Sequence, residues 1–369
     1  MIVRRFLQWL RSAPASERTK AASILARAYL QSELSAEERG AIERAMLLLL
    51  DDASPLVRGA LAIGLASSPQ APLPIVRGLA ADQPDIAAII LKTSPLLSEA
   101  DLVDAVATGG PLAQQAIAAR KDLSPPVAAA IAEIGSAEAC LVLIENIAVL
   151  SPHSLTRIVE RFGHLAAIRD AALIRSDIPV PIRHELVTKL SSALRDYVVA
   201  RDWLPPARAT DAVREACEKA SVDLAGQTQQ EEMRALVAHL RDSGQLTASL
   251  LLRALFAGHS ALFEVALADL SGLGGARVRR LVRTGEGLRA LYDKAGLPAL
   301  AYPAFHQALA TLRENASRDA AAQSHRIERV LKSCEENRES ASLLALLRDF
   351  SVEAARDEAR VYCAQRLAA

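Results

Sequence analysis

The feature of this sequence that most constrains its fold is a close succession of helix-start signals. Ser35 is followed by Glu38 in the spacing of a capping box, in which the serine hydroxyl accepts from the glutamate backbone N–H and the glutamate side chain reaches back. Serine directly precedes proline at Ser54-Pro55, Ser124-Pro125 and Ser151-Pro152, which places a capping residue before a proline at the first helical position. These signals divide the chain into segments of roughly ten to fifteen residues, the length of short helices.

The composition indicates that these segments are all helical. Of the 369 residues, 51% are hydrophobic but only 4% are aromatic. Much of the apolar content is alanine and leucine, which favour helices and allow close helix–helix packing. The alternating pattern of β-strands is absent from the sequence. We therefore predict an all-α fold, and the length favours two domains or one elongated repeat array.

One helical hairpin is especially well marked. An expected helix over residues 35–50 is followed by Asp52 and, after a proline, by the pair Val57-Arg58. Small residues such as Gly64 fall on the same helical face as Val57 and let a neighbouring helix approach closely. This pattern resembles the HEAT repeat, in which an Asp and a Val-Arg pair open the second helix of each hairpin. In that family the two charges commonly pair within or between repeats, so the resemblance implies a structural ion pair between Asp52 and Arg58.

Three weaker copies of the pattern follow along the chain. They begin at Asp82, Asp122 and Asp177, each a few residues before a proline and a β-branched residue. Their spacing of roughly 30 to 55 residues is uneven and brackets the HEAT period of about 40. Residues 35–190 therefore resemble an irregular HEAT-like α–α superhelix, or solenoid, with residues 16–31 as its N-terminal cap.

A change of character is expected at Pro205 and Pro206, which cannot continue a helix. We predict a HEAT-like helical repeat domain over residues 1–203 and a second, all-helical domain over residues 204–369. The second part consists of short helical segments closed by glycine or proline, at 244–272, 276–282 and 288–298. This order resembles an uncharacterised bacterial family, a domain of unknown function that joins HEAT-like repeats to a helical C-terminal half. The resemblance implies no activity.

The sequence contains no catalytic motif. The glycines at 272–275 and 285–287 lack the strand and the GK[ST] of a phosphate-binding loop, and residues 258–260 lack the context of a nucleophile elbow. The seven histidines form no HExxH pair. The cysteines form no CxxC and are expected to be reduced thiols in or near a core, so no metal or cofactor is predicted. They are Cys140, Cys217, Cys334 and Cys363.

One electrostatic cluster is a candidate binding site. Four arginines within about two helical turns can hold a phosphate or an acidic partner. Val278, Leu281 and Val282 occupy the buried spacing between them, so the arginines also fit an ordinary solvated face. Glu286 and Asp293 lie close enough to dilute the positive charge. The candidate residues are Arg277, Arg279, Arg280 and Arg283.

The charge balance separates the functional hypotheses. Basic and acidic residues number 43 each, whereas nucleic-acid binders usually carry a basic excess. The leading hypothesis is a non-catalytic protein-interaction scaffold or adaptor that binds a protein or peptide on its helical-repeat surface. The alternative is a nucleic-acid-associated HEAT-like protein, with DNA-glycosylase activity as its enzymatic form, since some HEAT-like proteins are DNA glycosylases. A third class, a lyase or chaperone for a bound cofactor as in HEAT-like phycobilin lyases, has no supporting motif.

No signal peptide and no membrane-spanning run is visible, so a cytoplasmic location is expected. The first residues form an apolar stripe that includes Ile2, Phe6, Trp9 and Leu10. We expect this stripe to pack onto the first hairpin rather than to lie on a membrane surface.

Overall fold

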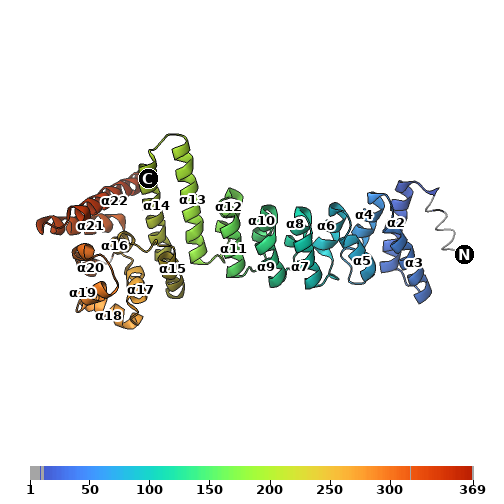
Figure 1. The fold of residues 1–369 in the computed structure, drawn as a ribbon, viewed down its shortest axis with the longest axis horizontal. Helices are drawn as coiled ribbons and strands as arrows, with labels where there is room; N and C mark the ends of the chain where they lie inside the picture. The colour runs from blue at the N-terminus through green and yellow to red at the C-terminus, as the bar shows by residue number, and fades with distance from the viewer. Residues whose placement is uncertain (1–8, 10–11, 316, 368–369) are drawn as a thin grey trace. The chain divides into compact units, whose positions relative to one another are not determined.

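The computed structural model describes residue 9, residues 12–315 and residues 317–367 (Figure 1). These described residues form 21 α-helices and one short 3-10 helix, with no strand among them, which confirms the all-α prediction. The contacts divide the chain into two compact units, Met1–Ile178 and Pro179–Ala369, called here the N-terminal and C-terminal units. The stripe from Ile2 to Leu10 lies, apart from Trp9, outside the described residues.

The N-terminal unit consists of short helices packed in two layers (Figure 1). Its helices are α2 (Ala15–Gln31), α3 (Ala36–Leu49), α4 (Pro55–Leu65), α5 (Leu73–Ala80), α6 (Pro84–Thr93), α7 (Glu99–Thr108), α8 (Pro111–Ala118), α9 (Pro125–Ile134), α10 (Ala137–Glu145), α11 (Pro152–Phe162) and α12 (Ala166–Ile174). Each even-numbered helix packs against the next from α2 to α12, and α7, α9 and α11 pack in succession as the other layer. Such stacking of helix pairs is the packing of a helical repeat array.

The repeats are shorter than the sequence signals suggest. Successive helices of the even layer begin at Pro55, Pro84, Pro111, Ala137 and Ala166, so the pairs recur every 26 to 29 residues. HEAT repeats recur about every 40 residues.

The Asp-Pro signals also fall in both layers. Asp82 precedes α6 in the even layer, but Asp122 precedes α9 in the other layer. The repeats at α8 and α10 were not recognised because α8 follows a glycine and α10 follows Ser136, without the aspartate.

The helix caps agree with the sequence in part. The capping box at Ser35 is present, with Ser35 N–H donating to Glu38 at 2.9 Å and the Glu38 N–H donating to the serine hydroxyl at 3.3 Å. Ser151 accepts from the backbone of the third helical residue at 3.0 Å. Ser54 and Ser124 make no capping bond, so two of the three Ser-Pro signals mark a helix start without the side-chain bond expected there.

The expected ion pair between the Asp52 and Arg58 side chains is wrong in its partners. Asp52 instead accepts from Arg18 of α2 at 2.7 Å, and Arg58 donates to Asp82 at 2.7 Å. Arg58 bonds to Asp52 only through the Asp52 backbone carbonyl, at 2.6 Å. Each arginine therefore reaches the aspartate that precedes the next helix of the even layer, and Asp52, the aspartate nearest Arg58 in sequence, is already bound by Arg18. Val57 is fully buried, as predicted.

Beyond α6 several arginines bond to the carbonyls at helix ends, and one of them, Arg175, also pairs with a carboxylate, that of Asp177. Arg120 donates to the carbonyls of Leu91 and Ser94, at 2.7 and 2.8 Å, at the C-terminus of α6. Arg161 bonds in the same way to the end of α9, at 2.6 and 2.7 Å, and Arg175 bonds to the end of α10 at 2.8 Å. The last carbonyls of a helix receive no hydrogen bond from an N–H group of the same helix. Each arginine therefore donates to carbonyls that would otherwise be left unpaired.

The C-terminal unit is organised around one buried helix. Its elements are α13 (Val180–Ala200), α14 (Pro206–Gln227), α15 (Gln230–Asp242), α16 (Ala248–Phe256), α17 (Ser260–Ser271), α18 (Gly275–Thr284), α19 (Leu288–Lys294), η1 (Ala299–Ala301), α20 (Tyr302–Glu314), α21 (Ala320–Glu336) and α22 (Ala341–Leu367). Every residue of α16 from Leu250 to Phe256 is buried, and α16 packs against α14, α17, α20 and α21. Arg326 of α21 is also buried and donates to the Phe256 carbonyl, at the end of α16, at 2.6 Å.

The helix break expected at the two prolines is present. α13 ends at Ala200 and α14 begins at Pro206. These two helices pack against each other within the C-terminal unit, whereas the contacts divide the chain after Ile178. The domain division at residues 203 and 204 stays a prediction, because contacts alone do not measure which segments fold independently.

The glycines of α4 offer a matched test of how closely the repeats pack. A Cβ atom at Gly59 would meet no atom within 4 Å, so Gly59→Ala should stabilise the protein by about 0.5–1 kcal/mol through helix propensity. A Cβ atom at Gly64 would lie 2.7 Å from the Cβ of Ala26 on α2, which has no side-chain rotation to relieve the overlap. Gly64→Ala should therefore destabilise by roughly 1–3 kcal/mol. Denaturant unfolding measures both, and equal stabilisation by both alanines would contradict the close α2–α4 contact.

A second prediction concerns the pairing of Arg58. Arg58→Ala should lower the free energy of unfolding by about 1 kcal/mol, because it removes charge-assisted hydrogen bonds that are largely shielded from water. In double-mutant cycles the coupling with Asp82→Ala should be about 0.5 kcal/mol or more and should exceed the coupling with Asp52→Ala. A larger coupling with Asp52 would contradict the Arg58–Asp82 pair and support the Asp52–Arg58 pair that the HEAT resemblance implies.

Candidate functional site

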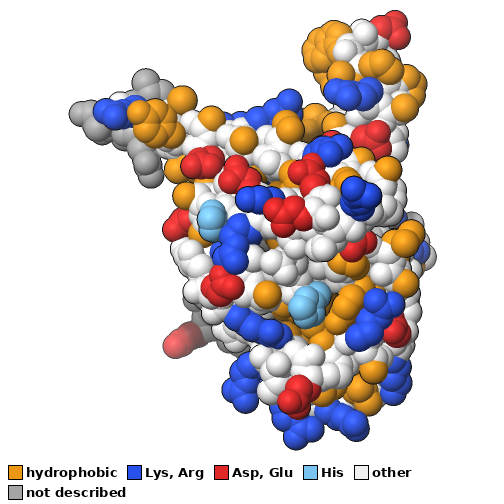
Figure 2. All heavy atoms as spheres, turned by 90° about the vertical axis from the view of Figure 1, so that its left-hand side faces the viewer, with side chains coloured by type: hydrophobic (Ala, Val, Ile, Leu, Met, Phe, Trp, Pro, Cys, Tyr) orange, Lys and Arg blue, Asp and Glu red, His pale blue; other side chains and the backbone are white. Residues whose placement is uncertain are grey.

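The structure places all four candidate arginines on α18. Arg277, Arg279, Arg280 and Arg283 are exposed, while Val278 and Val282 beneath them are buried. Within the described part of the chain, none of the four side chains makes a hydrogen bond or an ion pair. Figure 2 shows lysine and arginine side chains gathered at the lower end of this unit, where α18 and α19 lie in Figure 1. The exposed face of α18 is therefore a positively charged surface.

Two adjoining cavities lie along α18. The larger, of about 780 Å³, lies between α15, α17 and α18, and the smaller, of about 600 Å³, lies between α17, α18 and α20. They share Glu264, Ala276 and Arg279, so they meet at the first turns of α18. We call the two cavities together the α18 groove. Arg280 and Arg283 line the smaller cavity, whereas Arg277 lines neither.

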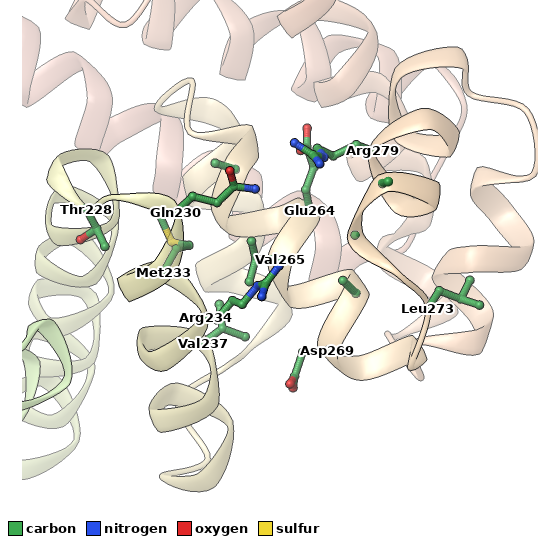
Figure 3. A pocket seen from close by; sticks show the side chains of 14 residues that line it. Thr228, Gln230, Met233, Arg234, Val237, Glu264, Val265, Asp269, Leu273 and Arg279 are labelled. Atoms are coloured by element: carbon green, nitrogen blue, oxygen red, sulfur yellow. The ribbon is translucent and has the colours of Figure 1, made fainter.

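The floor of the larger cavity is apolar. Figure 3 shows Met233 and Val237 of α15 on one side of this cavity and Val265 of α17 beside them. Met233 and Val237 are buried in the core, and Val265 packs against that core. The floor is therefore a continuation of the hydrophobic core onto the surface, held in place by the packing of α15 and α17.

The edges of the larger cavity carry charges of both signs. Glu264 and Arg279 lie beside each other at one edge, and Arg234 and Asp269 lie further along (Figure 3). Burial raises the pKa of the Glu264 carboxyl, and the nearby charge of Arg279 opposes this rise. Asp269 is bound by Arg241 at 2.6 Å, which neutralises it.

The positive charge of the groove exceeds its negative charge. Five arginines and two carboxylates line the two cavities. The dilution expected from Asp293 is reduced, because this carboxylate pairs with Arg289 at 3.0 Å. The fifth arginine of the lining, Arg313 of α20, donates to the backbone carbonyl of Val282.

The sequence did not identify the residues that α15 and α17 contribute. Met233 and Val237 are four residues apart, which is the spacing of an ordinary buried helix face, and nothing in that spacing distinguishes a core from a groove floor. Glu264 and Arg279 lie 15 positions apart and meet only because α17 packs against α18. The arginine cluster was the single part of this site that the sequence could locate.

A buried serine–histidine contact resembles part of a catalytic triad but cannot act as one. The His184 Nε2 atom on α13 lies 2.8 Å from the Ser221 hydroxyl on α14, and both side chains are buried. Ser221 donates its hydroxyl proton to the Cys217 carbonyl at 2.7 Å, so His184 must donate to Ser221. A catalytic base accepts that proton instead. The contact is structural.

The thiols and possible metal ligands give no second site. Cys140, Cys217 and Cys334 are buried, and Cys363 is exposed. Burial raises the pKa of the Cys140 and Cys334 thiols to about 11, which disfavours the reactive thiolate. Among the described residues, no three His, Cys, Asp or Glu side chains are grouped to hold a metal ion.

The fold and groove define the class of the protein: an all-α chain with a helical repeat array followed by a second helical unit that carries a surface groove. The chain belongs to DUF2336, an uncharacterised protein family conserved in bacteria, whose model matches residues 86–339. This range begins within the first turn of α6 and contains the later repeats and the whole α18 groove. No curated protein and no solved structure matches the chain. None of the described helices has both the length and the apolar character needed to cross a bilayer.

The buried histidine predicts a dependence of stability on pH. Burial, with the nearby charge of His239, lowers the pKa of His184 from 6.5 to about 4. The unfolded chain therefore binds this proton more readily, and stability should fall by about 3 kcal/mol as the pH drops from 6.5 to 4. His184→Gln keeps a hydrogen-bond donor for Ser221 and cannot titrate, so its unfolding free energy should fall much less over this range. Equal losses in both proteins, measured by urea unfolding, would exclude His184 as the cause.

Proposed function

We propose that this protein is a non-catalytic interaction adaptor whose α18 groove binds a segment of a partner protein. The observation that carries the proposal is the combination, in one groove, of an apolar floor with a rim of charges of both signs. Protein interfaces have this anatomy, with an apolar centre that is shielded from water and a polar rim. A groove with helical walls suits a partner helix that inserts apolar side chains from one face.

The proposal extends to the N-terminal unit. We propose that its helical array is an irregular HEAT-like solenoid with shortened repeats, held in a fixed geometry by the arginines that join one repeat to the next. Such arrays present long, rigid surfaces to protein partners. The array would therefore offer further contact surface to the partner or to a second protein.

The groove supports a protein partner better than the alternatives. Binding of single-stranded nucleic acid relies on aromatic side chains that stack on bases, and no residue lining the groove is aromatic. The net charge of zero provides little long-range field to attract a polyanion. A small ligand is usually enclosed, whereas these two cavities extend along the surface on both sides of the start of α18. The exposed arginines of α18 are the observation that favours nucleic acid.

The proposal can be tested by blocking the groove. Ala276 lines both cavities and is exposed, so Ala276→Trp should fill the point where they meet. Peptides selected from a displayed library on the full-length protein should bind this variant at least about tenfold more weakly. Ala290→Trp is the control, because Ala290 is exposed on α19 and lines neither cavity. Selected peptides that bind all three proteins equally would refute the groove as the binding site.

A further inference from the structure

We propose that the segment bound by the α18 groove is an acidic amphipathic helix, with apolar side chains on one face and Asp or Glu beside them. This inference rests on the proposed function and adds the chemistry of the partner. The four arginines on the exposed face of α18 are the groups that would select it. The apolar floor alone would accept any hydrophobic helix.

The arginines of α18 are in an unfavourable arrangement, and none of their side chains makes an ion pair or a hydrogen bond in the described part of the chain. Arg279 and Arg283 are separated by four positions, and Arg280 lies three positions from Arg283 and from Arg277. Like charges at these spacings are neighbours on a helix and destabilise it. Some exposed arginines elsewhere do have carboxylate partners, as Arg329 does with Glu314.

Two of the carboxylates near the groove are already paired with other arginines, while Glu286, three positions after Arg283, is exposed and dilutes the cluster from one end. Asp269 is held by Arg241 and Asp293 by Arg289, at 2.6 and 3.0 Å. Glu264 lies beside Arg279 but makes no ion pair with it, and burial raises its pKa. The positive charge of α18 therefore remains available to a partner.

The position of the arginines favours carboxylates that flank an apolar anchor. Arg279 lines both cavities, and Arg280 and Arg283 line the smaller one together with Leu309 and Leu312. Arginine holds a carboxylate in a bidentate geometry with two parallel hydrogen bonds. A helix with apolar residues in the cavities would place side chains three or four positions away over α18. Acidic residues at those positions would complete the charge pairing.

The inference predicts both the composition of the bound peptides and their response to charge reversal. Peptides whose binding is lost in Ala276→Trp should be enriched in Asp and Glu beside apolar residues. Combined Arg279→Glu, Arg280→Glu and Arg283→Glu substitutions should weaken their binding by roughly tenfold to a hundredfold. Added salt should weaken binding to the wild type, because exposed charges are screened. The substituted side chains are exposed and the buried face of α18 is unchanged, so the fold should persist, as circular dichroism would verify.

A matched control separates a local effect from a change in net charge. Arg208, Arg338 and Arg356 are exposed in the same unit and line neither cavity. Their combined replacement by glutamate changes the net charge equally and should leave peptide binding within about twofold of the wild type. An equal loss in both triple variants would overturn the inference, because binding would then follow net charge and not the α18 face.

The remaining outcomes distinguish this inference from the proposed function. Neutral or basic peptides that depend on Ala276 and tolerate the α18 reversals would overturn the acidic partner and leave the adaptor function intact. The absence of any peptide sensitive to Ala276→Trp would overturn both. A single-stranded oligothymidylate that binds more tightly than the non-specific range of about 10⁻⁴ to 10⁻⁶ M at physiological salt, and is lost with the α18 reversals, would replace the acidic protein by a nucleic acid.

Discussion

The N-terminal unit depends on arginine side chains that extend from one helix pair to the next. Its helices after α3 have only 8 to 11 residues, so carbonyls without an intrahelical partner are a large fraction of each helix. Burying those carbonyls between repeats would be costly without donors. Arg120 and Arg161 supply two donors each from a single planar guanidinium, which lysine could not place with the same geometry. The short helices of these repeats therefore depend on the arginines that donate to their terminal carbonyls.

The C-terminal unit uses the same interaction around a larger core. Arg326 is buried and satisfies the end of α16, the helix on which the other elements pack. Arg313 reaches the carbonyl of Val282 near the C-terminus of α18. That bond, with the burial of Val278 and Val282, fixes α18 from its inner side and its end. The exposed arginines on the outer face of α18 take no part in these contacts, so their charge is available to a ligand.

The sequence predicted the elements of the fold well and their partners poorly. Helix starts are local, so the Ser35 box and the break at Pro205 and Pro206 could be predicted from neighbouring residues alone. The partner of Arg58 could not, because Asp82 lies 24 positions away and the choice between two aspartates depends on which one is already occupied. The α18 groove could not be predicted from the sequence for the same reason, because α15, α17 and α20 contribute its walls from separate segments of the chain.

The arginines of this chain fall into two groups that the sequence alone does not separate. Arg161 and Arg283 both lie in the last turn of a short helix. Arg161 bonds to the carbonyls of a neighbouring helix, whereas Arg283 bonds to none and lines a cavity. Removing the first leaves buried carbonyls unpaired and acts on stability; removing the second relieves repulsion within α18 and acts on whatever binds there. The loss or gain of folding stability is thus the physical property that separates a structural arginine from a binding one in this protein.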